Sequence, residues 1–322
     1  MPVLAGHDPA DVRRAARLLA AGELVAFATE TVYGLGARAD DDAAVARIYA
    51  AKGRPAGHPL IVHLADAAAA RHFAATLNAP AQRLVEAFWP GPLTVIVPRA
   101  PGRGAAAAGG QDSIGLRVPA HPVALALLRE AAALGVPGVA APSANRYGHV
   151  SPTTAAHVVQ EFGPALAVLD GGACDIGIES AIVDCTRAQP ALLRPGQLGR
   201  QRIEAVLGMA LAAPDAASPR APGTLASHYA PAAPLRLFDA AKPPLRAARA
   251  GEVFGVYSRL APAADAAWLH RAMPADAATM AHELFAVLRG FDAAGVSAIW
   301  VERPPPDPAW DGVRDRLRRA AA

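Results

Sequence analysis

The sequence predicts an α/β protein with a larger domain on a mixed, twisted sheet and a smaller domain on a parallel sheet. Many short apolar runs of strand length alternate with segments whose apolar residues repeat at helical spacing. The 322 residues also exceed a single typical core. A stretch rich in alanine, proline and small polar residues, 212–223, separates the two groups of elements. We therefore expect domains over residues 1–210 and 234–322, joined by a linker over 211–233.

The larger domain is expected to open with a helix, because Asp8 can cap it, Pro9 suits its first position and Gly22 follows its end. Apolar runs predict strands over residues 24–28, 60–64, 93–97, 114–118, 139–141, 167–169, 181–184 and 191–193. Helical spacing predicts further helices near 41–51, 80–88, 122–133 and 152–162. Ser151 is the expected cap of the last helix, with Pro152 at its first position.

In the smaller domain, strands near 235–239, 253–257 and 296–301 alternate with helices near 277–293 and 309–319, which is typical of a parallel α/β sheet. The run RDRLRR, residues 314–319, is expected to be a solvated helix end, and contact with nucleic acid is the alternative.

Composition narrows the function classes. No stretch supplies the roughly 20 uninterrupted apolar residues of a membrane span, and no export signal opens the chain, so we expect a soluble, cytoplasmic protein. The two cysteines, Cys174 and Cys185, are too few for a disulfide scaffold and are expected to be buried thiols. The formal net charge of +3 suits a polyanionic partner or an anionic small molecule equally.

The segment KGRPAGHPL, residues 52–60, carries two cations beside a proline and a glycine, directly before an apolar run. Cations fixed in a loop can bind phosphate or carboxylate, although a solvated charged turn fits the same letters. The pattern GxGxxA at residues 34–39 lacks a helix starting at its glycines, which disfavours a dinucleotide fold. The P-loop, HExxH and GxSxG patterns are absent from the sequence.

Polar side chains capable of binding anions follow the ends of several predicted strands. They are Thr31, Tyr33, Lys52, Arg54, Arg117, Ser143, Asn145, Ser151, Ser180 and Arg194. Strand ends in an open α/β sheet form its ligand cleft, so we expect these side chains to converge. Cations interleaved with hydroxyls suit a ligand with several phosphates and an amino-acid-like group. No pair of carboxylates accompanies them, which favours catalysis by electrostatic stabilisation and positioning.

Six motifs occur in the order TETVYGLG, KGRPAGHPLIVHL, WPGPLTVIV, LRVPAHP, APSANRYGHVSPT and GIESAIVD. Together they resemble the YrdC-like domain of threonylcarbamoyl-AMP synthases over about residues 10–208. The SHYAP segment and the small domain after it resemble the long, two-domain form of that family. The resemblance implies a YrdC-like mixed sheet with an open basic cleft, followed by a Rossmann-like parallel domain.

The resemblance implies a nucleotidyltransferase that forms L-threonylcarbamoyladenylate and pyrophosphate from L-threonine, bicarbonate or CO₂, and ATP with Mg²⁺. Protein side chains would hold no metal. The product serves N6-threonylcarbamoyladenosine formation through a downstream tRNA transfer machinery, with a weak tRNA contact possible and no membrane.

The resemblance also implies the roles of individual residues. Threonine would be bound by Thr31, His63, Arg117, Ala141 and Ser180. The nucleotide would be bound by Tyr33, Lys52, Arg54, His58, Ser113, Ser143, Asn145, Ser151, Arg194 and the linker residue Tyr229, with Lys52 and Arg54 as the catalytic pair. His58 stands where many relatives have asparagine.

Two other functions fit part of the pattern. One is an RNA-binding or ribosome-associated module without catalysis, which the low aromatic content of 5% disfavours because bases stack on aromatic rings. The other is carbamoyl transfer in hydrogenase maturation, where a similar domain occurs together with zinc-finger and acylphosphatase-like segments that this chain lacks.

Overall fold

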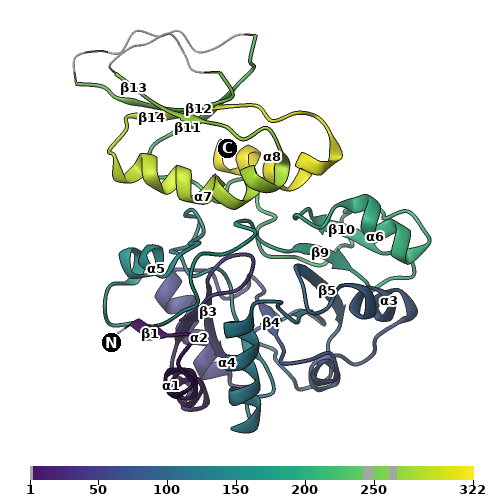
Figure 1. Cartoon of the computed structure of the whole chain (residues 1–322). Coiled ribbons are helices and arrows are strands. Elements are labelled where there is room, and N and C mark those ends of the chain that lie inside the picture. The colour runs from purple at the N-terminus through teal and green to yellow at the C-terminus, as the bar shows by residue number, and fades with distance from the viewer. Residues whose placement is uncertain (1–2, 242–248, 250, 261–266) are drawn as a thin grey trace.

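The computed structural model describes residues 3–241, 249, 251–260 and 267–322. Within these ranges the chain forms two sheets, one in each domain, and Figure 1 shows the smaller domain above the larger one. The larger sheet has ten strands in the order β1-β8-β2-β3-β7-β4-β6-β5-β9-β10, and the smaller sheet has four in the order β11-β14-β12-β13. The predicted pairing of a mixed sheet with a smaller parallel sheet is confirmed.

The larger sheet mixes parallel and antiparallel neighbours. Its strands are β1 (Val3–Ala5), β2 (Val25–Phe27), β3 (Gly34–Arg38), β4 (Ile61–His63), β5 (Leu93–Pro98), β6 (Ser113–Arg117), β7 (Val139–Ala140), β8 (Ala167–Asp170), β9 (Ala181–Asp184) and β10 (Ala191–Arg194). Strands β4 and β6 are parallel neighbours, with His63 directly opposite Arg117 at their ends. Side chains opposite each other on neighbouring strands share one face of a sheet, so these two meet.

Local sequence signals set the helix ends of the larger domain. Helix α1 (Pro9–Ala20) is capped by Asp8, whose side chain accepts from the amide of Ala10. Helix α2 (Asp42–Lys52) stops at Gly53, which adopts the left-handed conformation at φ 65°. The remaining helices are α3 (Ala79–Phe88), α4 (Pro122–Ala133), α5 (Ala155–Phe162), α6 (Arg200–Leu207) and the 3₁₀ helix η1 (Ala68–His72). Lys52 is therefore the last residue of a helix, and Arg54 lies in the loop after it.

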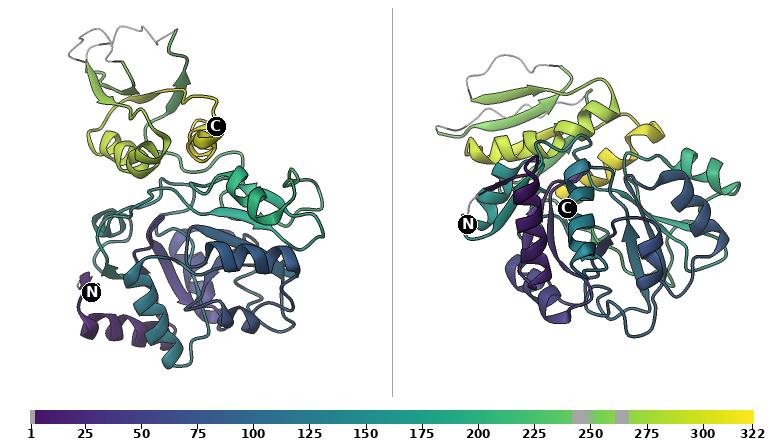
Figure 2. Two further views of the ribbon diagram at one scale, coloured as in Figure 1. Left: turned by 45° about the vertical axis from the view of Figure 1, so that its right-hand side comes forward. Right: turned by 60° about the horizontal axis from the view of Figure 1, so that its bottom comes forward.

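The smaller sheet is parallel throughout the described residues, with β11 (Leu235–Phe238), β12 (Phe254–Ser258), β13 (Trp268–Ala272) and β14 (Ala298–Glu302). Helices α7 (Ala277–Ala293) and α8 (Asp311–Ala320), with η2 (Pro308–Trp310), lie between this sheet and the larger domain (Figures 1 and 2). One apolar cluster includes Val32 and Ile178 of the larger domain together with Phe285 and Trp310 of the smaller one. The domains thus share buried apolar surface, which stabilises their docking.

Some local expectations were wrong or incomplete. Helix α5 begins at Ala155, and its cap is Thr154, whose hydroxyl accepts from a backbone amide in the first turn. Ser151 is not the cap, because its buried hydroxyl instead donates to the Glu179 carboxylate. Strands β1, β3 and β13 and helix α6 were not predicted.

Two expectations on composition can be compared with the structure. Both cysteines are buried and free, as expected. In the part of the chain that the structure describes, every helix is too short or too polar to cross a lipid bilayer.

Candidate functional site

A pocket lies where loops at the strand ends of the larger sheet meet the linker. Its walls include nine of the residues expected to bind ligand: Thr31, Arg54, His63, Arg117, Ala141, Ser143, Ser180, Arg194 and Tyr229. They come from segments spread over most of the larger domain and from the linker, and six of the ten residues that were predicted to converge are among them. Three guanidinium groups and several hydroxyls face one space, which suits an anionic ligand.

Arg117 organises one end of the pocket. Its Nη1 donates to the hydroxyl of Thr31 at 2.9 Å and its Nε to the carbonyl of Gly91 at 3.1 Å. Its Nη2 lies 2.6 Å from Oε1 of Glu30, an ion pair not aligned as a hydrogen bond. The neighbouring His63 is fully buried, and burial together with the Arg117 charge lowers its pKa to about 3. A neutral imidazole therefore stands beside a fixed cation.

Lys52 does not line the pocket but holds one of its loops. Its Nζ donates to the carbonyl oxygen of Ser143 at 2.5 Å and to that of Asn145. Burial, and then the nearby Arg54 charge, lower the pKa of Lys52 well below its usual value. In this arrangement Lys52 fixes the backbone of residues 143–145 from behind the pocket wall.

Arg54 faces the pocket and packs beside the ring of Tyr147. Its Nη2 donates to the carbonyl of Pro59 at 3.0 Å, and its guanidinium lies 5.6 Å from the ring centre of Tyr147. The Tyr147 hydroxyl is 2.9 Å from Nδ1 of His58, and its ring lies 6.2 Å from that of the linker residue His228. His58 thus does not line the pocket and contacts Tyr147 instead.

Four other expected residues also lie off the pocket wall. The Tyr33 hydroxyl turns away to Asp170, at 2.9 Å, so Tyr33 packs behind the wall instead of lining the cleft. Ser113 lines a second, smaller pocket that shares Ile61 and Pro222 with the first. Asn145 donates to backbone carbonyls, and its Oδ1 is buried without a partner among the described residues. Ser151 donates to a pocket carboxylate at 2.5 Å.

The linker covers the pocket. Pro222, Gly223, His228 and Tyr229 contribute to its walls, and Nη1 of Arg194 donates to the Pro222 carbonyl at 2.9 Å. Tyr229 is fully buried in a left-handed backbone conformation at φ 63°. Its hydroxyl and the Nδ1 of His228 have no hydrogen-bond partner in the described part of the chain. Buried polar atoms in native proteins normally have partners, so these are positions where a polar ligand would be stabilised.

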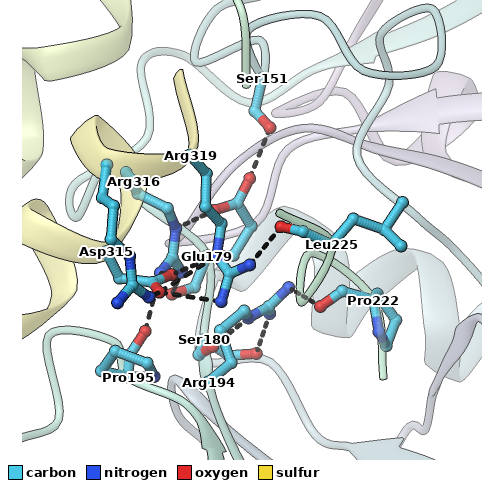
Figure 3. A network of polar contacts seen from close by, with 11 residues as sticks. Ser151, Glu179, Ser180, Arg194, Pro195, Pro222, Leu225, Asp315, Arg316 and Arg319 are labelled. Carbon is cyan, nitrogen blue, oxygen red and sulfur yellow. Dashed lines mark hydrogen bonds and ion pairs between the residues drawn. The ribbon is translucent and has the colours of Figure 1, made fainter. Parts of the chain in front are cut away.

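Sequence reasoning missed two acidic residues and one arginine here. Glu30 pairs with Arg117, while Glu179 lines the pocket and pairs with Arg316 of α8 at 2.8 Å (Figure 3). The expectation that residues 314–319 form a solvated helix end was therefore wrong, since Arg316 is completely buried. A signal existed: Arg316 lies three residues after Val313 and adjacent to Leu317, on the apolar face of the helix.

Comparisons with known proteins agree with this arrangement. The family model described as "Telomere recombination" matches residues 17–196, and the model described as "Threonylcarbamoyl-AMP synthase, C-terminal domain" matches residues 198–322. The threonylcarbamoyl-AMP synthase of Bacillus subtilis is 38% identical over 99% of this chain and 94% of its own length. That of Pyrococcus abyssi is 37% identical over 96% of this chain and 94% of its own length.

Solved structures lead to the same family. The crystal structure of Pyrococcus abyssi Sua5 complexed with L-threonine superposes with a TM-score of 0.86 at 35% identity, covering 98% of this chain and 95% of that one. A double variant of the same protein superposes with a TM-score of 0.87 and covers 98% of this chain and 93% of that one. These relatives extend over both domains, and their likeness favours catalysis over a bare RNA-binding module. The chain belongs to the threonylcarbamoyl-AMP synthase family, in its two-domain form.

Proposed function

We propose that this protein joins L-threonine, bicarbonate or CO₂, and ATP into L-threonylcarbamoyladenylate and pyrophosphate, acting as a nucleotidyltransferase. The observation that carries the proposal is the pocket itself, where Arg54, Arg117 and Arg194 face buried hydroxyls beneath a covering linker. Relatives named for this product, one of them solved with L-threonine, support it over the whole length of the chain.

Threonine is assigned to the Arg117 end. A carboxylate there would receive a charge-assisted hydrogen bond from the guanidinium, and the Thr31 hydroxyl already lies 2.9 Å from Nη1. The neutral His63 beside them adds no second positive charge. Ala141 and Ser180 complete this end of the wall.

In the proposed reaction the amine of threonine adds to CO₂ and loses a proton, giving a carbamate. A carbamate oxygen then attacks the α-phosphorus of ATP, a new O–P bond forms, and the bond to the β-phosphate oxygen breaks as pyrophosphate leaves. Negative charge grows on the phosphate oxygens, where Arg54 and Arg194 face the pocket. Lys52 acts by holding the 143–145 loop, and it reaches the phosphates only if that loop moves on binding.

Magnesium is proposed to enter as part of the substrate, Mg·ATP. The pocket carboxylate Glu179 is already occupied by hydrogen bonds from Ser151 and Arg316. Mg²⁺ commonly keeps several waters and takes its remaining ligands from substrate phosphates, which fits a pocket richer in cations than in carboxylates.

The linker is proposed to shield the intermediates. Carbamates and mixed anhydrides react with water, so the site needs a cover during the reaction. Residues 222–229 already occupy this position, and they must detach for ATP to enter and product to leave. We expect the product to be consumed in the cytoplasm by the machinery that transfers the threonylcarbamoyl group to tRNA.

The test is conversion of ATP to AMP-containing product and pyrophosphate that depends on both threonine and bicarbonate. Arg54→Ala is expected to fold normally and lose about 3–4 kcal/mol of transition-state stabilisation, a rate loss of a few hundredfold or more. Arg318→Ala, on the exposed side of α8, serves as the matched control and should retain activity. ATP turnover that ignores threonine, or binding of tRNA without turnover, would overturn the proposal.

A further inference from the structure

Arg316 is a completely buried arginine that the smaller domain inserts into the larger one. Its Nε donates to Oε2 of Glu179 at 2.8 Å and its Nη2 to the Glu179 carbonyl at 3.1 Å (Figure 3). Its Nη1 donates to the carbonyl of Pro195 at 2.8 Å and also contacts Asp315. The buried guanidinium thus donates to charged and backbone acceptors on both sides of the domain boundary. This is more hydrogen bonding than a typical surface ion pair makes.

Its partner Glu179 is part of the pocket wall. One carboxylate oxygen accepts from Ser151 at 2.5 Å and the other from Arg316. Burial alone would raise the pKa of Glu179, but the charges of Arg316 and Arg194 outweigh it and hold the pKa below its usual range. A pocket suited to phosphates therefore contains a full negative charge, and Arg316 is the group that pairs with it most directly.

Arg316 and its helix also contact the linker that covers the pocket. The guanidinium lies 5.3 Å from the ring centre of Tyr229, and that ring stacks on Phe285 of α7 at 5.6 Å. The next turn of α8 continues the contact, because Arg319 donates to the carbonyl of Leu225 and accepts from the amide of His228 at 3.1 Å. Arg316 therefore contacts both the Glu179 carboxylate in the pocket wall and Tyr229 in the linker that covers the pocket.

We propose that Arg316 is a positioning residue for the nucleotide: by neutralising and orienting Glu179 and by holding Tyr229, it lets the smaller domain set the affinity of the pocket for the polyphosphate. This rests on the proposed function in so far as ATP is the anionic ligand. Without Arg316 the Glu179 charge repels incoming phosphates and competes with them for Arg194. At the threonine end, Ser180 follows Glu179 in the chain, but the guanidinium of Arg117 contacts Thr31, Gly91 and Glu30 and neither Glu179 nor Arg316.

The decisive experiment compares Arg316→Met with the double variant Arg316→Met, Glu179→Gln. The single variant is expected to raise the KM for ATP at least tenfold while the KM for threonine stays within twofold. The double variant removes the unpaired charge, and its amide oxygen still accepts from Ser151, so the KM for ATP should return to within about threefold of wild type. Arg318→Ala on the same helix is the matched control and should change neither KM.

Several results would overturn the proposal. They are an unchanged KM for ATP, an equal rise in both KM values, or a double variant no better than the single one, which is what loss of a purely structural ion pair predicts. If Arg316→Met does not fold, Arg316→Lys is the test variant, because lysine keeps the positive charge but cannot donate to the Glu179 carboxylate and carbonyl from two nitrogens at once. For this variant, a rise of less than tenfold in the KM for ATP with an unchanged KM for threonine supports the proposal. No rise in the KM for ATP, or an equal rise in both KM values, rejects it. Calorimetry on the same proteins measures the dissociation constant of ATP without turnover. An inactive wild type would therefore refute the proposed function, and the ratio of dissociation constants would still test the role of Arg316.

Discussion

Acidification is expected to detach the linker from the pocket, through His228. Burial, with the charges of Arg54 and Lys52, lowers the pKa of His228 to about 3, against 6.5 for a solvated imidazole. Glu179 opposes this shift without cancelling it. When the linker opens, the imidazole regains water and its ordinary pKa. Between pH 6.5 and 3 only the open form takes up a proton, so closure is fully stable above pH 6.5 and weakens as pH falls.

The magnitude follows from the two pKa values. At pH 5.5 the open form is favoured by about 1.4 kcal/mol relative to neutral pH, which is about tenfold in the closing equilibrium. Hydrogen exchange can measure it at the amides of His228 and Ala230, which donate to the carbonyls of Arg319 at 3.1 Å and Gly148 at 2.8 Å. Protection factors, corrected for the pH dependence of chemical exchange, should fall about tenfold between pH 7.5 and 5.5.

His228→Asn is the control, because asparagine does not titrate in this range. The buried His63 and His157, with pKa values of about 3 and 4, are present in both proteins, so the difference between wild type and variant isolates His228. Equal loss of protection in both proteins, or none in wild type, would refute the reasoning.

Three further outcomes follow from the packing. Gly223→Ala places a methyl group 2.1 Å from the Tyr229 hydroxyl at φ 73°, so the linker should exchange faster and ATP turnover should fall; wild-type protection of the linker would contradict this. Gly177→Ala, at φ 83°, brings a methyl within 2.3 Å of a backbone oxygen of α7 and should lower the free energy of unfolding by about 1–3 kcal/mol, measured by denaturant titration. Burial raises the pKa of Cys174, and that of Cys185 to about 12, so both thiols should resist a thiol reagent at pH 8 until the protein is unfolded, and rapid native labelling would count against their burial.

Where the signals are local, the sequence predicts the fold closely. Asp8 and Pro9 start α1 as expected, and the predicted helix over 277–293 is found with the same bounds. Convergence was predicted in part from the position of polar residues after strand ends, and the structure adds that the strands ending in His63 and Arg117 are parallel neighbours.

The errors arise where distant contacts decide. Ser151 and Thr154 are both good helix caps by residue type. Ser151 instead donates its hydrogen bond to Glu179, which lies 28 residues away in the chain. Arg316 belongs to a run of charged residues, and such runs usually lie on the solvent-exposed face of a helix. Its partner, Glu179, lies 137 residues earlier in the chain. No local pattern identifies which of several arginines finds such a partner. The glycines of β3 likewise lie in a strand, and at Gly36 the side chains of Phe27 and Val139 leave no room for a Cβ atom.

The insertion of Arg316 also bears on how the molecule is made. Synthesis on the ribosome runs from the N-terminus, so the larger sheet can fold while α8 is still untranslated. Until that helix emerges, the carboxylate of Glu179 lacks its main counter-ion and the linker lacks the surface on which Tyr229 rests. If the larger domain folds before α8 emerges, its pocket is still incomplete at that stage, and the arrival of α8 completes it.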